Sequence, residues 1–371
     1  MRRALAKSLG AVEERFIISV KTDNAGTSAD NEFTLPTTGT GYNYDIEYDG
    51  QTLTGQTGSV TLTFPSGAGT YNVKISGDFP RCYFNNGGDK AKLLDIKNFG
   101  IYALGSTTQE NAFRGCLNLA ISATDIGYFE NVTTFKRSWD GCSSLTSFPV
   151  IDTSSCVSFD TVWSGCSSLT SFPLLDTSSG TNFNLTWAGC SSLTSFPLIN
   201  TSSATNFRFT WAGCSSLTSF PLLDTSIVTG INGAWSNCSS LTSFPQINTS
   251  NVSLFSRFGN EGAWGGCSSL TSFPLLDFSN GTDFGGTWYS CSNLTSFPAN
   301  AFDKNIATNY PNAFFNTNLT TQSIDDILVS LDTSGVSNGT FAQSGGQAPS
   351  ATGIAAKDSL VAKGWTITYT A

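Results

Sequence analysis

The residues that carry most enzyme chemistry are scarce in this chain of 371 residues, which contains no histidine. Without histidine, Ser-His-Asp and Cys-His nucleophiles and the HExxH zinc site are excluded. Ten cysteines are present, but none of them form the C-x-x-C pairs that are typical of zinc sites. Eight of the cysteines recur at one position of a repeat, where we expect buried thiols, with disulfides between neighbours as the alternative. We therefore predict no metal site and no cofactor.

Carboxylates also recur at one position of the repeat, where asparagine replaces aspartate in some copies. The position is occupied by Asp152, Asp176, Asn200, Asp224, Asn248 and Asp277. Both side chains accept a backbone N–H at a turn, so turn capping explains the exchange better than calcium binding. Glycosidases need two neighbouring carboxylates, and we identify no such pair among the remaining acids of the repeats. We expect no catalytic residues and no enzyme, with a polysaccharide depolymerase as the less favoured alternative.

The elements that carry these residues are copies of one repeat. The sequence G-C-S-S-L-T-S-F-P occurs at 141–149, 165–173, 189–197, 213–221 and 266–274, with close variants at 237–245 and 290–298. Most copies are 24 residues apart, and in each of them a tryptophan precedes the cysteine by three residues. A unit of this size cannot bury its own apolar face, so neighbouring units must stack. The sequence predicts a mainly β fold with a solenoid of about eight coils over 105–319, in which L-T-S-F-P is a short strand ending at proline.

The repeated pattern aromatic-x-G-C-S-S-L-T-S, followed by D-T-S, resembles the BspA-like leucine-rich-repeat surface proteins, a group that includes the Mycoplasma-type lipoprotein repeats. The resemblance covers residues 105–320. It implies a leucine-rich-repeat-like solenoid that faces the outside of a cell or particle and recognises a partner without catalysis. It names no ligand.

One row of the repeat varies in charge and size while its surroundings stay the same. Three residues before successive tryptophans the row reads Asp160, Asn184, Arg208, Asn232 and Glu261, and a coil five residues longer adds Phe255, Arg257 and Phe258. Varied positions and insertions on a rigid repeat are where recognition is usually placed. We predict that these eight residues bind a host surface glycan or protein. As an alternative, Phe255 or Phe258 replaces the inward-facing Phe of the other coils.

Residues 15–104 contain no copy of the repeat and alternate like short strands separated by turn residues. The runs Y-D-G at 48–50 and G-T-Y-N-V at 69–73 look like the signature of PKD-type domains, which implies a small PKD- or Ig-like β-sandwich. Ahead of it, Leu5, Leu9, Val12 and Phe16 have helical spacing. We predict an amphipathic helix at 1–14, which either packs on its own domain or anchors the chain in a larger assembly.

The composition changes again over residues 320–371, where we predict an α/β cap for the last coil. Ser323 is expected as the N-cap of a first helix that ends near Gly335. A second helix is expected to end at Gly364, and a strand to follow at 365–369.

Charge and hydropathy narrow the partners and the location. A net charge of −9 disfavours nucleic acid as a partner. The sequence contains no run of 18 apolar residues, so we predict no membrane insertion. The first residues lack the apolar core of a signal peptide, which a bacterial adhesin of the resembled family needs. We therefore expect a phage structural protein on the virion surface, folded in the host cytoplasm, as a tail fibre, spike or head-decoration component. Its N-terminal region would bind other virion proteins. A bacterial cell-surface adhesin is the alternative, and association into a homo-oligomer stays open.

Overall fold

The computed structural model describes residues 13–256 and 262–370. Within these ranges, strands far outnumber helices, which confirms the predicted mainly β class. The chain divides into two compact units, Met1–Cys156 and Val157–Ala371. The helix predicted at 1–14 lies almost wholly outside the described residues.

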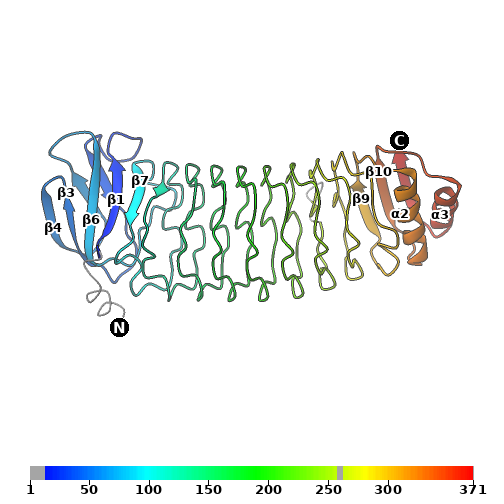
Figure 1. Cartoon of the computed structure of the whole chain (residues 1–371), viewed down its shortest axis with the longest axis horizontal. Helices are drawn as coiled ribbons and strands as arrows, with labels where there is room; N and C mark the ends of the chain where they lie inside the picture. The colour runs from blue at the N-terminus through cyan, green and yellow to red at the C-terminus, as the bar shows by residue number, and fades with distance from the viewer. Residues whose placement is uncertain (1–12, 257–261, 371) are drawn as a thin grey trace. The chain divides into compact units, whose positions relative to one another are not determined.

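The first unit starts with two β-sheets (Figure 1). One sheet has the order β4-β3-β6-β1-β7-β8, and in the other β2 pairs with β5. The strands are β1 (Phe16–Lys21), β2 (Glu32–Leu35), β3 (Asn43–Tyr48), β4 (Gln51–Gln56), β5 (Val60–Thr63), β6 (Thr70–Asp78), β7 (Leu93–Asn98) and β8 (Ala120–Ile121). Neighbours are antiparallel except β7 and β8, which are parallel.

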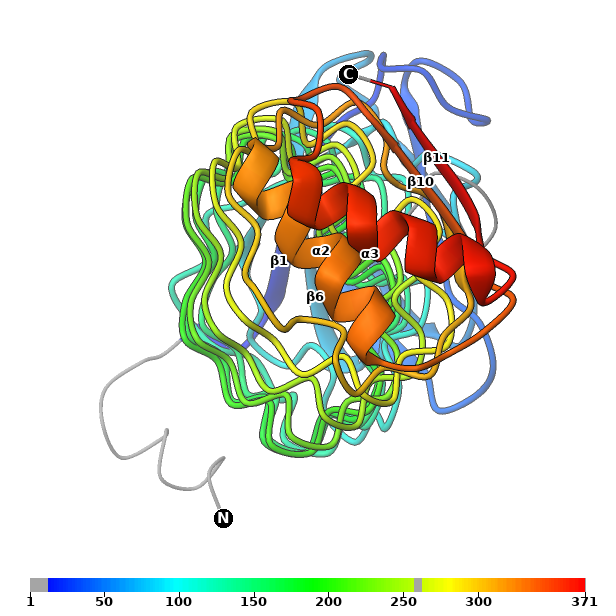
Figure 2. The ribbon, with the colours of Figure 1, turned by 90° about the vertical axis from the view of Figure 1, so that its right-hand side faces the viewer.

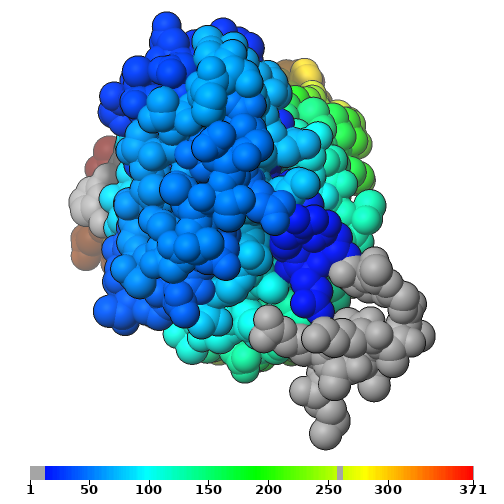
Figure 3. All heavy atoms as spheres, turned by 90° about the vertical axis from the view of Figure 1, so that its left-hand side faces the viewer, coloured from blue at the N-terminus to red at the C-terminus, as the bar shows by residue number. Residues whose placement is uncertain are grey.

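Alternating apolar residues explain why most of these strands could be predicted. In β3, Tyr44, Ile46 and Tyr48 are buried while the residues between them are exposed. The sequence Q-T-L-T-G-Q of β4 has no such alternation, and it forms because β3 offers it a partner across a tight turn at Asp49 and Gly50. Figure 3 shows the surface that this part of the chain (blue) presents to solvent.

The first copies of the repeat complete this unit, and they are built from turns. The backbone N–H of Phe113 donates to Ser138 O (2.8 Å), and that of Gly115 donates to Asp140 O (2.7 Å). The Phe113 ring stacks on Trp139 with centroids 6.1 Å apart. Phe113 therefore fills the position that tryptophan holds in later copies.

In the second unit each repeat forms one coil, which hydrogen-bonds to the next coil through its backbone (Figure 1). The N–H groups of Trp163, Trp187 and Trp211 each donate to a carbonyl of the following coil over 2.8–2.9 Å. The indoles of successive tryptophans, from Trp163 to Trp288, stack with centroids 5.6–6.0 Å apart. Because these rings are fully buried, the row of tryptophans is the centre of this unit's core.

The prediction that L-T-S-F-P forms a strand in each coil is wrong. Among residues 13–256 and 262–370, a single β-bridge involves these segments, between Ser272 and Ser296. A continuous row of bridges lies elsewhere in the coils, two residues before the varied row that begins with Asp160 and Asn184. It passes through Ser158, Asn182, Asn206, Gly230, Leu254 and Asp283. In these segments the backbones of neighbouring coils are bonded at the threonine, where Thr194 N donates to Thr170 O (3.3 Å), a carbonyl that also accepts from Thr194 Oγ1 (3.4 Å). Proline has no N–H with which to extend the pairing.

The second unit ends in a parallel sheet of β9 (Asn309–Phe314), β10 (Thr340–Ser344) and β11 (Thr366–Thr370), connected by α2 (Thr321–Thr333) and α3 (Ala351–Ala362). The two helices lie side by side (Figure 2). The predicted helices are confirmed, but the N-cap of α2 is Thr320, whose side chain accepts from Ser323 N. Ser323 instead donates its hydroxyl to Thr295 O (3.3 Å) and accepts from Phe297 N (3.0 Å).

Candidate functional site

The predicted ligand row lies on neighbouring coils of the second unit, one residue after the buried aromatic or aliphatic residue of each coil. Asp160 and Asn184 are half-buried and adjacent, since Asn184 Nδ2 donates to Asp160 Oδ1 over 2.9 Å. The backbone N–H of Asn184 donates to Asn182 Oδ1 (3.1 Å), which fixes the turn. The row therefore begins with a carboxylate and an amide held together at the surface.

Arg208 and Asn232 continue the row on the next two coils. Arg208 is half-buried, and its Nε has no hydrogen-bond acceptor in the described chain. A Cβ built on Gly230 would lie 3.6 Å from Arg208 Cγ and 3.9 Å from Asn232 Oδ1, so both side chains occupy the space around this glycine. Asn232 is only 1% exposed, which corrects its prediction as a surface residue. Of these two side chains, therefore, Arg208 is the one that is partly exposed.

Phe255 is fully buried and stacks on Phe284 with centroids 4.8 Å apart. It therefore replaces the inward Phe of the other coils, and its prediction as a ligand contact is wrong. The row position next to it belongs to Ser256, a buried residue whose hydroxyl donates to Gly285 O.

The five extra residues of the long coil explain why Ser256 was overlooked. Ala263 N donates to Phe255 O, just as Ala234 N donates to Ile231 O in the preceding coil, so the extra residues follow Phe255. Ser256 therefore lies eight residues before Trp264, whereas Asn232 lies three residues before Trp235. The other three predicted residues, Arg257, Phe258 and Glu261, lie outside the described residues.

A hollow of about 370 Å³ opens in the second unit where the regular repeat ends. Its walls come from Gln246, from 275–279 and from 300–305. Leu275, which is 46% exposed, contributes apolar surface. The polar lining consists of Gln246, Asp277, Ser279, Asn300, Asp303, Lys304 and Asn305. The hollow thus combines an apolar surface with amides, carboxylates and an ammonium group.

A break in the repeat builds this hollow. After Pro298 the chain reads A-N-A-F-D-K-N in place of L-L-D-T-S, and Asn300 adopts a left-handed conformation (φ 61°) that lets the chain turn. The loop is anchored by Asn305, whose Oδ1 accepts from Tyr310 OH (2.6 Å) and from Ala307 N (2.7 Å). A fixed loop gives the hollow a preformed wall.

The electrostatics of the hollow keep Asp277 ionised. Hydrogen bonds from the Ser279 hydroxyl and backbone N–H lower the pKa of the Asp277 carboxyl, and the Lys304 charge adds to the effect. Asp303 Oδ1 accepts from the Ser330 hydroxyl (2.6 Å). Within the described chain, no hydrogen bond is made by the Asn300 amide or the Lys304 ammonium group, so both are available to a ligand.

This site was not predicted from the sequence, although one residue signals it. The position after each F-P is an exposed leucine in several coils of the second unit, namely Leu174, Leu198, Leu222 and Leu275. Gln246 is the polar exception, and its Nε2 donates to Leu275 O (3.0 Å) at the rim of the hollow. A single polar substitution in an apolar row was the available clue.

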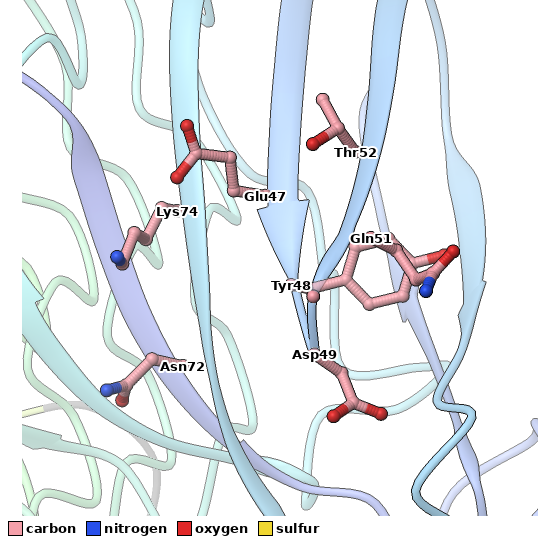
Figure 4. Close-up of a pocket in the computed structure, with 8 residues that line it drawn as sticks. Glu47, Tyr48, Asp49, Gln51, Thr52, Asn72 and Lys74 are labelled. Atoms are coloured by element: carbon pink, nitrogen blue, oxygen red, sulfur yellow. The ribbon is translucent and has the colours of Figure 1, made fainter.

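A second hollow, of about 480 Å³, lies in the first unit on the face of β3 and β6 (Figure 4). Glu47 and Lys74 are cross-strand partners there, and Glu47 also pairs with Arg15 at 2.8 Å. Glu47 therefore already has a partner in Arg15, and its position opposite Lys74 is that of an ordinary cross-strand pair. This hollow carries less chemical specificity than the first.

The cysteine row has no reactive character. All ten cysteines are buried, and thiols such as Cys214 Sγ donate to the carbonyl of a tryptophan in the preceding coil (3.3 Å to Trp187 O). Burial raises the pKa of Cys214 well above its ordinary value. Over residues 13–256 and 262–370, no cluster of three or more Cys, Asp or Glu is arranged to hold a metal ion, and no helix has the length and hydropathy to cross a membrane.

No known family model matches this chain, and no curated protein matches its sequence. The function is therefore argued from the residues and their geometry.

Proposed function

We propose that this chain is a non-enzymatic recognition protein of a virion, a phage tail fibre, spike or head-decoration component that binds a host surface glycan or protein. In this proposal the coils form a leucine-rich-repeat-like solenoid of the BspA-like kind, and the two sheets of residues 15–104 form a sandwich. The N-terminal region attaches to other virion proteins, and the coils carry the ligand site.

The observation that carries the proposal is the contrast between an invariant interior and a varied surface row. Tryptophan, cysteine and leucine recur unchanged inside each coil of the second unit, held by the same backbone hydrogen bonds. On this frame the row changes from Asp160 to Asn184 to Arg208 in adjacent coils. A rigid frame that presents different polar groups at fixed spacing is suited to recognising an extended ligand.

The carboxylates of the hollow favour binding over hydrolysis. A glycosidase needs one carboxylic acid that stays protonated near neutral pH, which requires a raised pKa. The pKa of Asp277 is lowered instead, because hydrogen bonds and Lys304 stabilise its charged form. Asp277 is therefore suited to accepting hydrogen bonds from a ligand and poorly suited to the role of general acid.

The proposal is tested by the binding of the fluorescently labelled full chain to a panel of Gram-negative and Gram-positive cells, measured by flow cytometry. We expect binding to a subset of strains and a clear loss of binding in Arg208→Ala. Lys357→Ala, which removes a positive charge from α3, is the matched control and is expected to bind normally. Absence of binding to every strain, or equal binding by the two variants, would contradict the proposal.

A further inference from the structure

The hollow at the end of the regular coils is a preformed site for a small polar ligand. Its volume of about 370 Å³ falls within the range of small-molecule sites, roughly 300–1,000 Å³. Three separate stretches of the chain converge on it, and the loop from Asn300 to Asn305 is held by buried hydrogen bonds. The side chains that face a ligand are therefore positioned before it arrives.

The polar groups of the hollow include both hydrogen-bond donors and hydrogen-bond acceptors. Asp277 and Asp303 accept hydrogen bonds, Lys304 donates them, and the amides of Gln246 and Asn300 do both. A ligand that satisfies such a mixture must itself carry several groups that donate and accept at once, which is the property of hydroxyl groups. Leu275 adds an exposed apolar surface for C–H groups.

Charge narrows the ligand further. Two carboxylates and one ammonium group line the hollow, so an acidic sugar would be repelled by the net negative charge. The Asp277 carboxylate remains charged because its pKa is lowered. Hydroxyl groups, in contrast, form charge-assisted hydrogen bonds with both kinds of ion.

We infer that this hollow binds a neutral, hydroxyl-rich sugar residue of a surface glycan. The inference rests on the proposed function and deepens it, because it names the chemical class of the ligand. It also assigns the contact to Gln246, Asp277, Asn300, Asp303 and Lys304, a set that is separate from the predicted row.

The repeats suggest two substitutions that the fold should tolerate, because other coils of this chain carry the new residue at the same position. Gln246→Leu introduces the residue that occupies the same position in other coils, such as Leu222. Asp277→Asn introduces the residue found at Asn200 and Asn248, where the amide oxygen accepts the same backbone N–H. The matched controls are Leu222→Gln and Asp224→Asn, which make the corresponding exchanges in a coil that does not line the hollow.

The test is saturation-transfer NMR and titration of the full chain with the methyl glycosides of glucose, galactose and mannose, and with methyl glucuronide as the acidic probe. A neutral hexoside is expected to bind with a dissociation constant of about 1 mM, and methyl glucuronide more weakly. Gln246→Leu and Asp277→Asn are each expected to weaken binding roughly fivefold, the effect of one lost hydrogen bond of about 1 kcal/mol. The two controls are expected to bind like the unmodified chain.

The inference is overturned if no neutral hexoside binds, if methyl glucuronide binds more tightly, or if the variants and controls behave alike. These results are separate from the cell-binding experiment. Cell binding that depends on Arg208 without hexoside binding would remove the sugar site and leave the proposed function standing. Hexoside binding without cell binding would contradict the proposed function and leave the sugar site standing.

Discussion

At the scale of single residues, the indole of Trp211 illustrates how each coil is stabilised. Its ring lies between those of Trp187 and Trp235, at centroid distances of 5.8 and 5.6 Å. The Phe196 and Phe220 rings meet it edge-on at 5.3 and 4.7 Å. Its Nε1 is buried and has no hydrogen-bond acceptor in the described chain. Apolar and aromatic contact therefore stabilises this residue, and its polar atom adds nothing.

The stability lost on replacing Trp211 should accordingly depend on how much of the aromatic ring is removed and not on the loss of the indole N–H. We expect Trp211→Ala to lower the free energy of unfolding by about 3–5 kcal/mol, because it leaves a large cavity. Trp211→Phe should cost clearly less, since it removes an unpaired buried donor and since Phe113 and Phe314 hold this position in other copies. Urea unfolding followed by circular dichroism measures both. Equal losses in the two variants would contradict this explanation.

The buried thiols make a second prediction at this scale. Burial raises the pKa of Cys267 to about 12, and that of Cys238 well above its ordinary value. Because the thiolate is the reactive form, the native protein should not react with a thiol reagent such as DTNB at about pH 8. All ten thiols should react after denaturation without a reductant. Fewer than ten would reveal disulfides, and rapid labelling of the native protein would show that the thiols are accessible.

At the scale of elements, the sequence predicts best where the pattern is local. The helices α2 and α3 were predicted from local signals, although the N-cap of α2 is Thr320 and not Ser323, and β1, β3 and β6 were predicted from their alternation. The L-T-S-F-P segments do not form regular strands, because neighbouring coils are bonded there mainly at the threonine, as between Thr194 N and Thr170 O, and proline has no N–H to extend the pairing. The strand β10 was missed since Thr340–Ser344 forms only between β9 and β11. Such pairing is set by tertiary context.

The turn-capping aspartates predict how the coils respond to acid. Hydrogen bonds from a serine two residues later lower the pKa of Asp176, Asp224 and Asp277. A lowered folded-state pKa stabilises the protein above the unfolded value of about 3.9, and this stabilisation is lost as the pH falls through the folded value.

We therefore expect the melting temperature to fall as the pH is lowered from about 5 to about 2.5. The triple variant Asp176→Asn, Asp224→Asn, Asp277→Asn should lose less over this range, because an amide does not titrate. Asn200 and Asn248 show that the turn accepts this exchange. Calorimetry at a series of pH values measures the effect, and identical pH profiles would contradict it.

At the scale of the whole molecule, the period of the sequence predicts an interior but not a ligand site. The buried tryptophan, cysteine and leucine positions could all be predicted, because each copy repeats the same constraint. The hollow could not, since it depends on how the loop at 300–305 meets coils that are distant in sequence. Two of the predicted ligand residues, Asn232 and Phe255, are buried. Side chains of neighbouring coils surround Asn232, and the insertion that follows Phe255 leaves Phe255 at the inward position of its coil.

The C-terminal region should be needed to protect the last coil. Ser323 and Ser330 accept the buried N–H groups of Phe297 and Phe302 (3.0 and 2.7 Å), so removing residues 320–371 leaves both donors unpaired. The truncated chain should also expose the ring of Phe314, which packs against Phe341. We expect it to associate or precipitate, as light scattering would show. A monodisperse truncated chain with unchanged stability would contradict the capping role.

The central claim is that this chain recognises a surface ligand without transforming it. The most direct measurement incubates the full chain with purified capsule or lipopolysaccharide from a strain that it binds, and follows both co-sedimentation and the appearance of reducing ends. We predict that the protein sediments with the polysaccharide, that a neutral hexoside competes, and that no reducing ends are released. Release of reducing ends with time, or the absence of any binding to the polysaccharide, would contradict the account.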